Sequence, residues 1–176
     1  MSYEPWLAVT NAQALRFFYE RLREVVHERA ADAADDELLY NASVLAHFAT
    51  TSTVSTTDFP PSPVNLSTVF DVFVLDRSQH VDPDLMEAAG SQCLMLTGFF
   101  QDQQSHRHNV DWFADLGADF YESAAHLSRD PSRGRIMGAM AAHFSFWRRQ
   151  QRRLAAELRD EPRLIHVPKT EEGLEA

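Results

Sequence analysis

Two histidines and an aspartate near the middle of the chain could bind a metal ion. His106 and His108 are separated by one residue, and Asp111 follows three positions later. Imidazole nitrogens and a carboxylate are ligands that suit Zn²⁺, Ni²⁺ or Cu²⁺. The spacing matches none of the common zinc patterns, so solvent-exposed loop histidines are the competing interpretation. We expect no cofactor, with a divalent metal at these three residues as the alternative.

A second group of polar residues falls on what the spacing predicts to be a mostly apolar helix face. His143 lies four residues before Trp147, and Gln150 and Gln151 continue along the same edge. A buried imidazole or amide must find hydrogen-bond partners or it lowers stability. These residues are therefore either satisfied core residues or the wall of a ligand pocket. In a pocket, His143 would serve as a general base or as a ligand to haem or a metal.

Four arginines follow in the same segment, next to an aromatic residue. Arg148, Arg149, Arg152 and Arg153 spread over the polar side of the predicted helix, close to Phe146. Such a surface could contact an acidic protein, a second copy of the chain or nucleic-acid phosphates. The net charge of −10 argues against nucleic acid. A solvated or internally paired face is the competing interpretation.

Established catalytic motifs are missing from the sequence. It contains no Gly-x-Ser-x-Gly, no glycine-rich phosphate loop and no His-Glu-x-x-His. Glu24 and His27 give one half of a di-iron motif that needs two such halves. The single cysteine, Cys93, falls within a predicted helix and is expected to be buried and inert. These observations favour a protein that is not an enzyme, and they leave enzymatic activity open.

Composition indicates one soluble, helical, bacterial domain. The 176 residues are 44% apolar and 24% charged, with six glycines and eight prolines, which favours long helices over a turn-rich sheet. Arginine provides 15 of the 16 basic residues, a usage that suggests a GC-rich bacterial genome. No apolar run reaches the ~18 residues of a membrane span, and no secretory signal opens the sequence. We expect a cytoplasmic protein with no membrane partner.

Charge is distributed unevenly along the chain. Residues 30–128 hold 15 acidic residues and two arginines, whereas residues 129–163 hold nine arginines and four acidic residues. Opposite charges of this kind attract one another over several ångströms. The basic end could therefore dock on the acidic body of the same molecule, on a second copy or on an acidic partner.

The elements that must position these residues are predicted to be helices, because apolar residues recur at helical spacing almost throughout. Thr10 and Gln13 resemble a capping box at the start of the first helix, and Asp82 and Asn109 resemble N-caps of later ones. A long final helix would span ~40 Å. The predicted helices cover residues 10–31, 36–50, 66–77, 83–100, 109–127 and 132–160.

Two stretches are less regular. Residues 51–65 are rich in Ser, Thr and Pro and are expected to form a surface connection or a lid. Residues 66–77 have the valines of a strand, but no other strand could pair with them, so a short helix is predicted. The whole is expected to be an all-α, single-domain bundle of about six helices over residues 1–163. Residues 164–176 would form a polar, flexible tail.

Parts of two predicted helices resemble a group of small uncharacterised all-α bacterial proteins. The resemblance covers about a fifth of the chain and implies an all-α fold and a bacterial source. It implies no function and no site residue. The sequence pattern of those proteins also includes an Asp, a pair of Tyr residues and a Met, which are replaced in this chain. The residues that carry it are Gly90-Ser91, Leu94, Gly98-Phe99-Phe100, Trp112-Phe113, Leu116-Gly117 and Tyr121.

Three functions follow from these observations. The first is protein–protein interaction or regulation, by a homodimer that uses Phe146 and the neighbouring arginines. The second is a small-ligand or metal-binding bundle that uses His143 or the His106/His108 loop, with enzymatic activity left open. The third is nucleic-acid binding through the arginine-rich C-terminal helix, which the acidic net charge disfavours.

Overall fold

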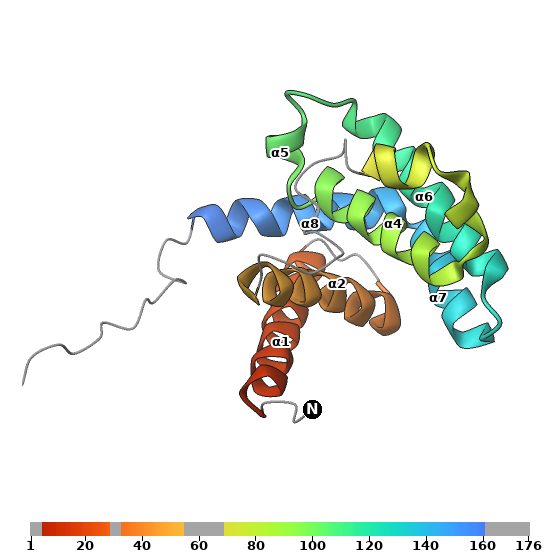
Figure 1. Ribbon diagram of the computed structural model, residues 1–176. Helices are drawn as coiled ribbons and strands as arrows, with labels where there is room; N and C mark the ends of the chain where they lie inside the picture. Colours follow the sequence, from red (N-terminus) through yellow and green to blue (C-terminus); the bar gives the residue numbers. More distant parts are fainter. Residues whose placement is uncertain (1–4, 29–32, 55–68, 161–176) are drawn as a thin grey trace, which may run out of the picture.

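Seven α-helices, one π-helix and one 3₁₀-helix make up most of the computed structural model, which describes residues 5–28, 33–54 and 69–160 (Figure 1). No strand occurs within these ranges, so the expected all-α, single-domain bundle is confirmed. The expected tail over 164–176 lies outside them. In chain order the elements are α1 (Pro5–His27), α2 (Asp35–Val54), η1 (Phe70–Val74), η2 (Arg77–Val81), α4 (Pro83–Thr97), α5 (Gln101–Gln104), α6 (Val110–Leu127), α7 (Pro131–Ala142) and α8 (Phe144–Asp160).

Side-chain caps define where three of the helices begin. The carboxylate of Asp82 accepts a hydrogen bond of 2.8 Å from the backbone N–H two residues later, and Pro83 occupies the first position of α4. Asn109 caps α6 as expected, at 3.2 Å. The Asp-Pro pair recurs at Asp130, which caps α7 at 2.9 Å. Each cap satisfies a backbone donor that the first turn of a helix leaves free.

Several expected boundaries are wrong. The predicted capping box at Thr10 does not start a helix, because α1 begins at Pro5 and Thr10 lies inside it. Helix α2 continues to Val54, four residues into the expected connection, and residues 55–68 lie outside the described parts of the chain. The expected polar loop 101–108 contains the short helix α5.

The ambiguous stretch before α4 is helical, but not in the expected form. Residues 70–74 form the π-helix η1, in which the N–H of Leu75 donates to the carbonyl of Phe70 at 3.1 Å. A π-turn inserts one extra residue per turn and is found disproportionately at functional sites. The five-residue 3₁₀-helix η2 follows and leads directly to the cap of α4.

The prediction of one long C-terminal helix over 132–160 is wrong, because the helix is broken at His143. This residue ends α7 with φ −106° and ψ 18°, and α8 starts at the next position. The break lets the two helices follow different neighbours: α7 packs mainly on α6, whereas α8 packs on α1 and α4. In Figure 1 α7 turns away from the line of α8. A straight helix could not make both sets of contacts.

Helices α4 and α6 pack closely because glycines replace side chains where they cross. A Cβ atom at Gly90 would lie 2.9 Å from the ring of Tyr121, and one at Gly117 would lie 2.6 Å from Cβ of Cys93. At Gly98 it would lie 3.1 Å from the carbonyl oxygen of Arg148 on α8. Gly90, Gly98 and Gly117 therefore allow these helices to approach closely.

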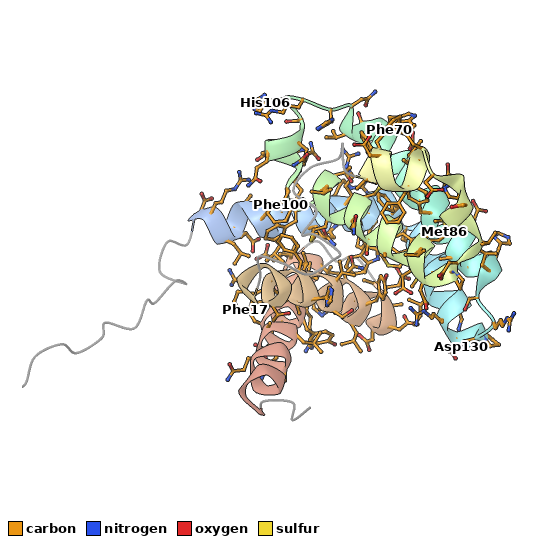
Figure 2. All side chains as sticks on the ribbon, in the orientation of Figure 1. Phe17, Phe70, Met86, Phe100, His106 and Asp130 are labelled. Atoms are coloured by element: carbon orange, nitrogen blue, oxygen red, sulfur yellow. The ribbon has the colours of Figure 1, made fainter. Side chains whose placement is uncertain are left out.

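The side chains between the helices form one apolar core (Figure 2). Of the helices described, none is long and apolar enough to cross a membrane. Fully buried apolar side chains come from every helix of more than ten residues, and they include Leu22, Leu45, Met86, Leu94, Tyr121, Met137, Met140, Trp147 and Leu154.

The α4–α6 contact predicts the effect of adding one methyl group. Gly117→Ala is expected to destabilise the fold by about 1–3 kcal/mol, since the new methyl overlaps Cys93 and Phe144. Gly138→Ala in α7 is the matched control, because its new methyl would lie 4.0 Å from Ala125. The control should stabilise by up to about 1 kcal/mol through helix propensity. Urea unfolding measures both, and equal effects would contradict the packing described.

Candidate functional site

A carboxylate lies inside the bundle, where α2 faces the start of α8. Glu37 is only 6% exposed. Its carboxylate accepts a hydrogen bond of 2.7 Å from the indole N–H of Trp147 and lies 3.0 Å from Nδ1 of His143. An ionised carboxylate can only accept, so the His143 hydrogen is on Nδ1. These two bonds offset part of the cost of removing the charge from water.

The polar contacts continue one turn further along both helices. The amide of Asn41 donates to the backbone carbonyl of Glu37 at 2.9 Å and lies 3.4 Å from the sulfur of Met140. Its oxygen accepts from the side-chain amide of Gln151 at 3.2 Å. We call Glu37, Asn41, His143, Trp147 and Gln151 the polar layer. It ties α2 to α8 and to the α7–α8 break.

The structure brings together most of the residues expected to form a ligand pocket. Three of the four belong to the polar layer, and the fourth, Gln150, is buried on α8 with no hydrogen-bond partner for its side-chain oxygen among the described residues. The expected core position of His143 is wrong, because its side chain is 56% exposed at the helix break. Ligand binding by these residues stays a prediction.

Sequence reasoning missed the two acceptors of the layer, Glu37 and Asn41. A signal was present, because the two residues are four positions apart and flank the apolar stripe that begins at Leu38. Residues at that spacing share one face of a helix. A carboxylate and an amide beside a buried stripe therefore indicate a buried polar pair. Their partners on α8 could not be identified without the fold.

The candidate metal ligands are not brought together. His106 lies on the outer loop after α5 (Figure 2) and is exposed. The ring of His108 packs against Phe113, with 5.9 Å between ring centres, and the carboxylate of Asp111 accepts from Arg148 at 2.8 Å. Within the part of the chain described here, no three His, Cys, Asp or Glu residues are placed to hold a metal ion.

The expected arginine surface is largely used inside the molecule. Arg148 donates to the carbonyl of Thr97 at 2.9 Å as well as to Asp111, so it fastens α8 to α4 and α6. Arg152 and Arg159 both lie near Asp102 on α5, at 3.8 and 2.8 Å. The basic end of the chain therefore docks on the acidic body of the same molecule, which was one of the expected arrangements.

The remaining residues of that expected surface make fewer polar contacts among the described residues. Phe146 is half-buried, with its ring 5.1 Å from the ring of Trp147. Arg149 is exposed and Arg153 is half-buried. Neither arginine has an ion pair among the residues described. An interface at this surface stays a prediction.

Two kinds of ionisable group lie in the core between α4 and α6. Cys93 is fully buried, and burial raises the pKa of its thiol above the usual range. Burial likewise raises the pKa of the Tyr40 and Tyr121 hydroxyls. The Tyr40 hydroxyl donates to Glu87 at 3.1 Å, and Glu87 also pairs with Arg133 of α7. These contacts join α2, α4 and α7. Burial keeps Cys93 in the protonated thiol form, which is a poor nucleophile.

A hollow that the sequence did not indicate opens between η1, η2 and α6. Its volume is about 270 Å³. The ring of His80 packs at 5.9 Å against Phe120, and its Nε2 donates to the carbonyl of Phe73, which leaves Nδ1 as an acceptor in the neutral ring. We call this feature the apolar hollow. Its lining residues are Val74, His80, Leu116, Asp119, Phe120 and Ser123.

Large apolar side chains are exposed next to the apolar hollow. Leu75 is 67% exposed directly after the lining residue Val74, and Val81 is 77% exposed directly after His80. Trp112 is exposed one turn before Leu116 on α6, and its ring lies 6.2 Å from the ring of Phe70. Single exposed apolar residues are normal on a monomer, whereas a larger apolar area around a hollow is typical of a binding surface.

Acidic side chains occur on two of the elements that form the apolar hollow, and one of them, Asp119, lines it. Asp115, Asp119 and Glu122 are exposed on α6, and Asp71 is exposed on η1, three positions before Val74. None of the four forms an ion pair within the described ranges. We call these four residues the acidic rim.

Comparisons of the chain with protein-family models, with curated proteins and with solved structures found no match. The site is therefore interpreted from its own geometry.

The polar layer predicts that replacing tryptophan by phenylalanine lowers the free energy of unfolding much more at position 147 than at position 112. Trp147→Phe removes both the N–H that Glu37 accepts and part of a fully buried ring, and it is expected to destabilise the fold by about 1–3 kcal/mol or more. Trp112→Phe is the matched control, because its indole is exposed, and should change stability by less than about 0.5 kcal/mol. Chemical unfolding followed by circular dichroism compares the two. Similar losses from both would show that the indole hydrogen bond contributes nothing.

Burial of Cys93 predicts slow alkylation in the folded protein. Because burial both shields the thiol and raises its pKa, iodoacetamide at neutral pH is expected to react at least about 100-fold more slowly than with the chain unfolded in urea. Mass spectrometry over time measures the two rates. Comparable rates would mean that the core around Cys93 is open to solvent.

Proposed function

We propose that this protein acts by binding another polypeptide through the apolar hollow, and that it is not an enzyme. The observation that supports this most directly is the group of exposed apolar side chains beside the hollow, Leu75, Val81 and Trp112. Aromatic and aliphatic side chains of this kind form the central anchors of protein interfaces.

The size of the hollow is compatible with the side chains of a polypeptide. Small-molecule pockets have volumes of roughly 300–1,000 Å³ and enclose most of the ligand. The hollow measures about 270 Å³, which suits one or two apolar side chains of a partner. The exposed Leu75 and Val81 extend the apolar area beyond the hollow, where the backbone of a partner could lie.

The location of the hollow on irregular helices also supports binding. One wall is built by the π-helix η1 and the 3₁₀-helix η2, and the other by the regular helix α6. Such irregular turns are less stable than α-helices. They allow the residues they carry to adapt to a partner.

The proposal differs from the first expectation in the surface that it uses. Arg148 and Arg152 of α8 are engaged with residues of the same chain, so we place the partner at η1, η2 and α6. A homodimer stays a prediction, as does action in the cytosol. Sedimentation of the purified chain would give the oligomeric state.

Site-specific cross-linking tests the proposal. With benzoylphenylalanine in place of Val81, illumination in the cells that naturally make the chain is expected to give a defined cross-linked polypeptide. Leu39 of α2 is the matched control, because it is also exposed, at 49%, but lies on another element. Adding Leu75→Asp to the Val81 probe should reduce the product severalfold, since it puts a charge into the apolar contact. No product at Val81, or equal products at Val81 and Leu39, would overturn the proposal.

A further inference from the structure

The acidic rim gives the apolar hollow a strongly negative surrounding. Residues 71–122 contain ten acidic residues and two arginines. Other carboxylates of this region are neutralised within the molecule: Asp111 pairs with Arg148, Asp102 with Arg159, and Glu87 with Arg133. The rim carboxylates have no such partner among the described residues.

The rim also has a regular geometry. Asp115 and Asp119 lie one turn apart on α6, and Glu122 follows three positions later. Residues at these spacings are about 5–6 Å apart along one side of a helix. Leu116 and Phe120 follow each of the two aspartates by one position and face the hollow. An apolar line and an acidic line therefore run side by side along α6.

The other wall repeats this arrangement. Asp71 of η1 is exposed, and Val74 of the same turn lines the hollow. The ring centres of Phe73 and Phe120 lie 6.1 Å apart, so these two side chains form part of the packing between η1 and α6. In Figure 1 η1 and η2 lie alongside α6. Exposed carboxylates therefore occur on both α6 and η1, two of the elements that form the walls of the apolar hollow.

From this charge pattern we infer that the partner segment is a basic amphipathic helix of another protein. Its apolar side chains enter the hollow, and its Lys or Arg side chains meet the acidic rim. This inference rests on the proposed function. A helix matches α6 because both present side chains at the same spacing, so that a basic residue every turn can face Asp115 and Asp119 in succession.

Charge also argues against the other occupants. An acidic segment would place like charges opposite one another along the rim, which is unfavourable. The arginine helix α8 of a second copy is a poor match, because Arg148, Arg152 and Arg159 already contact acidic residues of their own chain. The partner inferred here has the opposite charge to the acidic partner that the arginines of α8 suggested from sequence.

A set of three labelled peptides tests the inference on the full chain. The first, of about 18 residues and thus about 27 Å long as a helix, has leucines at helical spacing and lysines elsewhere. The second has glutamates in place of the lysines, and the third has the composition of the first in a non-amphipathic order. Fluorescence anisotropy is measured at about 0.05 M and about 0.5 M salt, where screening differs strongly.

The leucine–lysine peptide is expected to bind at least about tenfold more tightly than either of the others, and to weaken with salt. Asp115→Asn with Asp119→Asn is expected to reduce its affinity about tenfold, since each exposed ion pair contributes about two- to fivefold. Glu28→Gln serves as the control, because it removes one negative charge directly after α1, far in sequence from the acidic rim. We expect it to change the affinity for the peptide by less than about twofold.

Three results would overturn the inference: equal binding of the glutamate peptide, equal binding of the non-amphipathic peptide, or no effect of the double asparagine variant. Sequencing the partner segment cross-linked at Val81 separates this inference from the proposed function. A basic amphipathic segment supports both. An acidic or uncharged segment, or a second copy of this chain, overturns the basic partner and leaves polypeptide binding standing. No cross-link overturns both.

Discussion

The buried carboxylate of Glu37 is the constraint on which the arrangement of the helices depends. A charge at this depth must be hydrogen-bonded, since an unpaired one costs far more than a typical contact contributes. Two of its partners come from the second half of the chain, His143 and Trp147. Meeting both requires α8 to start beside α2, while α7 lies on α6. The chain bends at His143, which is itself a member of the polar layer.

This bend has consequences for the opposite side of the molecule. Helix α6 is covered by α4 on one side and by α7 on another, which leaves the short irregular helices η1 and η2 to cover what remains. They cover it incompletely, so Leu116 and Phe120 line an open hollow. Meanwhile Arg148 fastens α8 to the acidic body. Among the described residues the acidic rim has no ion pair, and this difference in charge pairing is the basis for the inferred basic partner.

The sequence predicted what depends on local physics and missed what depends on long-range contacts. Asp82 and Asn109 were identifiable as caps because a cap acts within three residues. The bend at His143 was not, since helical periodicity continues through it and its hydrogen-bond partner, Glu37, lies far away in sequence. Of the candidate ligand group, Trp147 and Gln151 were found as polar groups on an apolar face, but Asn41, which pairs with Gln151, was not. The hollow combines three separate elements, so no single stretch indicated it.

The most direct test of the account is an NMR titration of the isotopically labelled chain with the leucine–lysine peptide. Binding in the apolar hollow predicts amide shift changes centred on Val74, His80 and Phe120, with α8 unaffected. Changes centred on Arg149 and Arg153 of α8, or no changes at all, would contradict the claim that the hollow between η1, η2 and α6 is the binding surface.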